Sequence, residues 1–204
     1  VAYEVTDTEN GLVPQTATIT ITGANDPPIA VDIAIAATED GSTVTEAFSA
    51  TDADTSDVLT YAIASQPTEG SVSIDPANNT QFIFDPGTDF QDLADGETRN
   101  VSFTYTADDG NGKDNSVSEP ATVTFTVTGV NDNPVATADD GDGFITDENT
   151  AFTTDSVLTN DTDVDTTDTL SAVNLDDTGT QGIVTDNGDG TFNYDPNGQF
   201  EALG

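Results

Sequence analysis

The chain has 204 residues, of which 39 are acidic and two are basic, so its formal net charge at pH 7 is −37. This charge disfavours nucleic acid and anionic membrane surfaces as partners, because both are negatively charged themselves. Cysteine and histidine are absent, which excludes disulfide bridges, thiol nucleophiles, imidazole bases and the usual zinc and copper ligand sets.

The remaining candidate metal ligands are oxygen atoms, which suit a hard cation such as calcium. Low apolar content with high net charge is typical of disordered chains, but the strand patterns described below argue against disorder. Because so much like charge opposes compaction, we expect a fold that depends on bound metal. The chain shows no signal peptide and no apolar run long enough to span a bilayer, so we expect no membrane insertion.

The first section of the chain contains two strand-like patterns. Apolar and polar residues alternate from Val1 to Val5, and Ile19 and Ile21 alternate with threonines, which predicts two half-buried strands. Two strands are too few for a domain. We therefore expect residues 1–24 to be the last two strands of a preceding or neighbouring sandwich.

A short phrase divides the chain into repeats. Thr22-Gly23-Ala24-Asn25-Asp26-Pro27 recurs, with changes, as Thr128-Gly129-Val130-Asn131-Asp132-Asn133-Pro134. The period from Gly23 to Gly129 is 129 − 23 = 106 residues, about the size of one immunoglobulin-like sandwich. The sequence therefore predicts tandem repeats.

The section of residues 25–130 has the pattern of one complete sandwich. Turn-forming residues separate short runs rich in β-branched and aromatic side chains, and a short helical turn is expected near Phe90 to Ala94. The predicted strands are Ile29–Ala37, Ser42–Ser49, Asp57–Ala64, Gly70–Ile74, Thr80–Phe84, Asn100–Thr106 and Ala121–Thr128.

Residues 131–204 repeat the beginning of that section. The run Asp163–Asp168 corresponds to Asp52–Asp57, and Gly204 aligns with Ala94, so we expect a sandwich lacking its last two strands. Three explanations stay open. The chain is a window cut from a longer array, it is truncated, or residues 1–22 of one molecule complete the sheet of residues 134–204 of the next, which would build a head-to-tail filament.

The acidic motifs resemble those of the cadherin-like tandem repeats of large bacterial surface adhesins, which are often grouped with RTX adhesin extender domains. The phrase Asn131-Asp132-Asn133-Pro134 is similar to the family's linker, Asp52-x-Asp54 to its Asp-x-Asp motif, and Asp95-Gly96-Glu97 to its Asp-Arg-Glu motif. By the same resemblance, Glu39 stands for the bridging glutamate of the first strand and Asp108 for the acidic residue after the sixth strand. The resemblance covers essentially the whole chain.

Residue spacing supports the same sites. Asp52 and Asp54 are two residues apart, so their carboxylates face the same side of an extended segment. One calcium cluster is expected to join the end of the sandwich, the linker and the start of the next repeat, and another is expected at the first junction. Pro27 stands where the second linker has Asn133, so we expect fewer ions at the first junction. The expected calcium ligands are Asn25, Asp26, Glu39, Asp52, Asp54, Asp95, Glu97, Asp108, Asn131, Asp132, Asn133, Glu148, Asp163 and Asp165.

The fold class expected is therefore all-β: tandem immunoglobulin- or cadherin-like sandwiches with calcium-binding linkers. The leading functional hypothesis is a calcium-rigidified stalk repeat of an extracellular bacterial adhesin, with calcium and neighbouring repeats as partners. The alternatives are a subunit of a strand-donating filament and a calcium-dependent carbohydrate-binding module. A glycosidase using two carboxylates is disfavoured because no aromatic-lined cleft can be inferred, so we expect no enzyme. The competing interpretation of the acidic residues is that they cap turns and keep the surface soluble.

Overall fold

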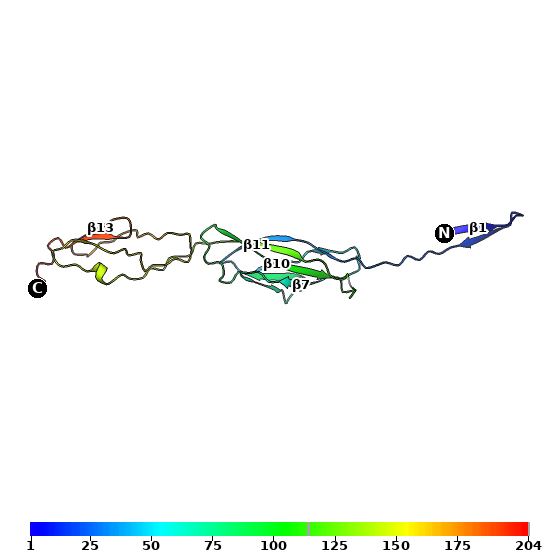
Figure 1. Cartoon of the computed structure of the whole chain (residues 1–204), viewed down its shortest axis with the longest axis horizontal. Helices are drawn as coiled ribbons and strands as arrows, with labels where there is room; N and C mark the ends of the chain where they lie inside the picture. The colour runs from blue at the N-terminus through cyan, green and yellow to red at the C-terminus, as the bar shows by residue number, and fades with distance from the viewer. Residues whose placement is uncertain (114, 204) are drawn as a thin grey trace.

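The computed structural model describes residues 1–113 and 115–203. It is elongated, with a hairpin near the N-terminus, a β-sandwich in the middle and a smaller three-stranded unit at the C-terminal end (Figure 1). The described residues contain strands, one short 3-10 helix and no α-helix, which confirms the expected all-β class. None of the helical segments in the described part is long and apolar enough to cross a bilayer.

The N-terminal hairpin differs from the sequence expectation. Strands β1 (Ala2–Thr6) and β2 (Leu12–Thr16) pair antiparallel, whereas Ile19 and Ile21 lie outside any described strand and are 73% and 90% exposed. The expected second strand around these isoleucines is therefore wrong. A tight turn explains the change, because Asp7 Oδ1 accepts hydrogen bonds from the N–H groups of Glu9 and Gly11, both at 2.9 Å, and closes the hairpin early. Every residue of the two strands is exposed, whereas half-buried strands were expected.

The central sandwich holds most of the regular structure. Its sheets have the strand orders β4-β11-β10-β7, β5-β9-β8 and β3-β6. All pairs are antiparallel except β4 and β11, which run parallel. The strands are β3 (Ile29–Ala30), β4 (Ile33–Thr38), β5 (Val44–Ala47), β6 (Ala50–Thr51), β7 (Thr60–Ser65), β8 (Ser71–Ile74), β9 (Gln81–Asp85), β10 (Thr98–Asp108) and β11 (Ala121–Thr128).

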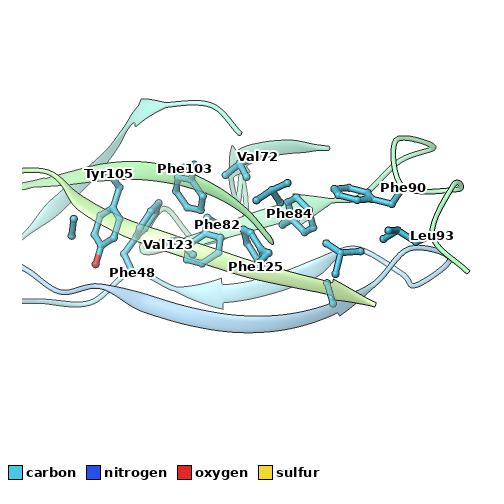
Figure 2. Packing of buried hydrophobic residues seen from close by; sticks show 14 residues of the cluster. Phe48, Val72, Phe82, Phe84, Phe90, Leu93, Phe103, Tyr105, Val123 and Phe125 are labelled. Carbon is cyan, nitrogen blue, oxygen red and sulfur yellow. The ribbon is translucent and has the colours of Figure 1, made fainter. Parts of the chain in front are cut away.

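Strand alternation builds the core between the two larger sheets. In β11 the side chains of Val123, Phe125 and Val127 are fully buried, and the threonines between them are only half-buried. Aromatic rings from β9, β10 and β11 pack together (Figure 2), and the rings of Phe84 and Phe125 stack with centroids 4.0 Å apart. Burying aromatic side chains of this size supplies much of a small domain's stability.

A buried tyrosine holds the N-terminal end of the sandwich. The Tyr105 hydroxyl lies 2.6 Å from the Val31 carbonyl oxygen and 2.7 Å from the Ser49 carbonyl oxygen, so it bridges the segments that follow β3 and β5. At the opposite end, the expected helical turn is a single turn in which the Leu93 N–H donates to the Phe90 carbonyl at 3.0 Å.

The C-terminal unit repeats part of this plan. The 3-10 helix η1 (Asp142–Phe144) precedes β12 (Phe152–Thr153), β13 (Ile183–Asp186) and β14 (Phe192–Asp195), which form a sheet of order β12-β14-β13. The register Val184 to Tyr194 in this sheet matches Val72 to Phe84 in the sheet β5-β9-β8. The division into residues 1–24, 25–130 and 131–204 stays a prediction.

Candidate functional site

Three carboxylates meet where the sandwich ends and the next unit begins. Glu39 follows β4, Asp132 lies in the linker, and Asp165 lies in a loop of the C-terminal unit. One oxygen from each lies within 4.8 Å of the other two. We call this group the junction cluster. Because each member comes from a different part of the chain, a cation held here would tie all three parts together.

The backbone of the sandwich places Glu39. Its N–H donates to the carbonyl of Thr128 at 3.1 Å, which extends the parallel pairing of β4 with β11. Its Oε1 then accepts a hydrogen bond from the Val130 N–H at 2.5 Å. The carboxylate is therefore anchored by one oxygen to the start of the linker.

The aspartates are placed by the linker and by the Asp-x-Asp motif. The Asp132 N–H donates to Asp165 Oδ2 at 2.9 Å, and the Asp165 N–H donates to Asp163 Oδ1 at 3.1 Å. Asp163 thus supports the Asp165 loop, and it lies close enough to Asp132 to raise its pKa by repulsion.

The electrostatics of the junction cluster are unfavourable without a cation. Glu39 and Asp165 are each 1% exposed. Glu39 Oε2, Asp132 Oδ2 and Asp165 Oδ1 are buried and have no hydrogen-bond partner among the described residues. Burial is the main cause that raises the pKa of Glu39 and of Asp132, and repulsion from neighbouring carboxylates adds to it. Buried charges need a compensating partner, and the neighbouring acids Asp40 and Asp163 add repulsion instead.

Asp95 and Glu97 lie next to the linker but outside the junction cluster. Glu97 Oε2 accepts from the Ala94 N–H at 3.2 Å, and the Glu97 carbonyl accepts from the Gly129 N–H at 2.8 Å. A Cβ on Gly129 would collide with the carbonyl oxygens of Leu93 and Ala94, so glycine is required there. In this structure, the motif acts as a support for the start of the linker.

A second acidic group, which we call the N-terminal cluster, lies at the other end of the sandwich. One carboxylate oxygen from each of Asp52, Asp57 and Asp109 lies within 4.8 Å of the others, and Asp52 Oδ2 is buried without a hydrogen-bond partner among the described residues. Asp52 is one of the ligands expected from the sequence, whereas Asp57 and Asp109 are not.

The expected ligand Asp108 lies on the other side of its strand from Asp109. Tyr105 and Ala107 point into the core along β10, and Asp109 continues this alternation and is 6% exposed. Asp108 instead accepts the Gly110 N–H at 2.7 Å, as a turn-capping residue does. The signal that identifies Asp109 is the period of two that runs through residues 105, 107 and 109.

The residues before the sandwich approach this N-terminal cluster. Asn25 Nδ2 donates to Asp109 Oδ2 at 2.8 Å, and the Asp26 N–H donates to Asp54 Oδ2 at 2.9 Å. The second contact repeats the pairing of Asp132 with Asp165. Burial raises the pKa of Asp109, but hydrogen bonds from Asn111 and Asn25 outweigh it, so that this pKa lies below its usual value.

Three other expected ligands lie outside both clusters. Asn131 Nδ2 donates to the carbonyl of Asp132 at 2.6 Å, Asn133 is exposed, and Glu148 accepts from Asn149 at 3.3 Å. For the whole set of expected ligands, the structure brings together Glu39, Asp132 and Asp165 at one end, and Asp52 with two unpredicted aspartates at the other.

Both clusters have donor atoms that could hold a cation. All their donor atoms are oxygens, and those left unpaired are buried and negatively charged. Hard divalent cations are bound by carboxylate and carbonyl oxygens. The buried oxygens without partners therefore fit a metal better than they fit turn capping alone, which would leave them unsatisfied.

Comparison with known families adds an independent finding. Residues 25–129 match the family model described as the bacterial cadherin-like domain, and residues 130–203 match the model described as the cadherin-like domain. No curated protein matches the chain.

Proposed function

The chain belongs to the bacterial cadherin-like domain family, and from this premise we propose that it is a calcium-rigidified stalk repeat of a bacterial surface adhesin. Calcium would hold successive repeats in line and so keep a distant adhesive end away from the cell surface. This proposal includes an extracellular location and places the chain in an adhesin of the RTX type. Cadherin-like domains are typically structural rather than enzymatic, which agrees with the expectation of no enzyme.

One observation carries the proposal. The junction cluster draws one carboxylate each from the sandwich, the linker and the next unit, and three of its oxygens are buried without a partner among the described residues. Glu39, Asp132 and Asp165 would hold the ion, and Asp52, Asp57 and Asp109 would hold another at the other end. A bound divalent cation would supply the positive charge that these carboxylates lack.

The energetic effect is large for a small domain. Extracellular calcium modules typically bind with dissociation constants of about 0.1–1 mM. At a hundredfold excess of calcium over the dissociation constant, each site would add roughly 2.7 kcal/mol to the folded form. A domain's total stability is only about 5–15 kcal/mol, so bound calcium would make a substantial contribution to the folded form.

Small-angle scattering with and without chelator tests the proposal. With millimolar calcium we expect a large, well-defined maximum dimension. With EDTA we expect a broader distribution of interatomic distances than with calcium, because the junctions lose the ions that hold the repeats in line. An unchanged radius of gyration would contradict the proposal, as would a titration calorimetry trace without heat of calcium binding.

A second candidate function is a subunit of a head-to-tail filament. The observation in its favour is a hollow of about 670 Å³ on the C-terminal unit, lined by Phe192, Tyr194 and Val184 among others. The equivalent residues of the sandwich, Phe82, Phe84 and Val72, are buried. Residues 1–22 carry seven exposed aliphatic or aromatic side chains, which is the kind of surface that strand addition would cover.

This candidate has its own test. Electron microscopy across a concentration series would reveal fibres, and deletion of residues 1–22 should abolish them. If sedimentation velocity shows a monomer at all concentrations, the filament candidate is excluded and the stalk function remains. Binding of the chain to a glycan array would instead support the carbohydrate-binding alternative.

A further inference from the structure

The two repeats also touch directly, beside the junction cluster. The carbonyl oxygen of Asp92 accepts two hydrogen bonds from Thr166, one from its N–H at 3.3 Å and one from its Oγ1 at 3.1 Å. Asp92 lies between β9 and β10 of the sandwich, and Thr166 lies in the C-terminal unit. Within the part of the chain that the structure describes, no other hydrogen bond joins residues 25–129 to residues 131–203.

The sandwich side of this contact is held rigidly. The Arg99 guanidinium forms a two-point ion pair with the Asp92 carboxylate, with N–O distances of 3.0 and 2.7 Å, and also contacts Glu69 at 2.9 Å. Such bidentate pairs fix direction as well as distance. Because Arg99 belongs to β10, the Asp92 peptide is fixed to the central sheet.

Positive charge is scarce in this chain, and one of its two basic residues forms this ion pair. Arg99 is one of only two basic residues in a chain with 39 acidic ones, and it lies next to the contact between the repeats. Its hydrogen bond to Asp92 is the main cause that lowers the pKa of that carboxyl group.

The other side of the contact is the loop that carries a member of the junction cluster. Thr166 directly follows Asp165, and the loop is closed by the Asp168 N–H, which donates to the Asp165 carbonyl at 3.0 Å. The linker alone is a single covalent connection, about which the C-terminal unit can rotate. A hydrogen-bonded contact between Asp92 and Thr166 closes a ring through the linker and removes that freedom.

We propose that Arg99, Asp92 and Thr166 form a cation-independent contact that sets the rotation of one repeat relative to the next. Arg99 and Asp92 are positioning residues, and Thr166 is the docking residue. The contact deepens the stalk proposal, on which its biological role rests, because the loop that it holds already carries Asp165. Calcium would then strengthen an alignment that the protein already favours.

The absence of cysteine makes a direct distance measurement simple. Cysteines introduced for spin labels at Ser102 and Thr185, which are exposed positions on β10 and β13, report the distance between the repeats by pulsed electron resonance. The measurement is made on the full chain in EDTA and again in calcium. The test variants are Thr166→Val, which removes the hydroxyl but keeps the branched shape, and Arg99→Gln, which removes the ion pair.

Thr55→Val is the matched control. Thr55 occupies the position after Asp52-Ala53-Asp54 that Thr166 occupies after Asp163-Val164-Asp165, and its side chain makes no hydrogen bond to the described residues. Circular dichroism melting of each variant checks that the sandwich is folded before distances are compared.

The outcomes are distinct. In EDTA we expect the distance distribution to be narrower for the unmodified chain and for Thr55→Val than for Thr166→Val and Arg99→Gln. Distributions of equal width in EDTA for the unmodified chain, Thr166→Val and Arg99→Gln overturn the proposed contact. If calcium changes no distribution and binds nowhere, the stalk proposal fails while the contact stands or falls on the EDTA data alone.

Discussion

At the scale of single residues, Glu39 has opposite effects on stability with and without a cation. Burial raises its pKa above the ordinary value of 4.5, so the folded chain binds this proton more tightly than the unfolded chain. The resulting stability is fully present below about pH 4.5 and is lost as the pH rises through the raised pKa. At neutral pH the ionised side chain therefore destabilises the calcium-free fold.

We predict that Glu39→Gln raises the melting temperature in EDTA at pH 7 and lowers it in calcium. The amide keeps the acceptor for the Val130 N–H but removes the buried charge. A change of about 1 kcal/mol would shift the melting temperature by roughly 4–8 °C in a domain of this size. Calorimetric melting with and without calcium measures both signs, and a variant that is less stable in both conditions would contradict the explanation.

A pair of adjacent aspartates allows a sharper test of the N-terminal cluster. Asp109 is buried within that cluster, whereas Asp108 caps the turn at Gly110. We predict that Asp109→Asn weakens calcium binding at this end about tenfold, or 1.4 kcal/mol, and that Asp108→Asn changes it little. Titration calorimetry of the two variants side by side distinguishes them. Equal losses would mean that the turn, rather than the inward carboxylate, determines affinity.

At the scale of strands, the sequence pattern predicts elements well where apolar and polar residues alternate strongly. It predicts them poorly where pairing with a neighbouring strand determines the ends. The run Ala121–Thr128 was predicted with the bounds of β11, because apolar residues and threonines alternate through it without a break. Strand β10 extends two residues beyond its predicted range at each end, since its ends depend on hydrogen bonds to β7 and β11. The strand expected at Ile19 failed because a local turn at Asp7 formed a different hairpin.

The candidate site was predicted in part for the same reason, because some of its residues are positioned by strand pairing and turns that the sequence pattern does not show. The linker and the Asp-x-Asp motif could be found from spacing alone, and the structure places Asp132 beside Asp165. Whether Asp108 or Asp109 faces inward depends on where β10 stops alternating, which is a property of the packed sheet. Asp57 joins Asp52 through a turn in which the Asp57 N–H bonds to the Asp54 carbonyl at 3.0 Å, and the sequence does not reveal that turn directly.

The strand β11 also supports a prediction about stability. Phe125 is fully buried and stacks on Phe84, so Phe125→Ala should destabilise the sandwich by about 3–5 kcal/mol. Thr126→Ala, on the outer face of the same strand, should cost less than about 1 kcal/mol. Urea unfolding at saturating calcium measures both, and similar losses for the two variants would show that the core does not dominate stability.

At the scale of the whole molecule, two different effects of calcium must be separated. A chain with a net charge of −37 is expanded by self-repulsion, and any salt screens that repulsion over about 10 Å at 0.1 M. Specific binding differs from screening because it neutralises buried carboxylates that monovalent salt does not reach. Bound ions would therefore align the repeats, whereas screening alone would only allow them to approach each other.

We predict that about 1–2 mM calcium, at or above the dissociation constants of about 0.1–1 mM typical of extracellular modules, increases the maximum dimension and narrows the distribution of interatomic distances. Sodium chloride at matched ionic strength should leave both unchanged. Raising sodium chloride to about 0.1 M in EDTA should shorten the mean dimension, because screened repeats bend towards each other. The double variant Asp132→Asn and Asp165→Asn serves as the control and should respond to calcium as it does to sodium. Equal responses of the unmodified chain to both salts would mean that calcium acts on this molecule only through its ionic strength.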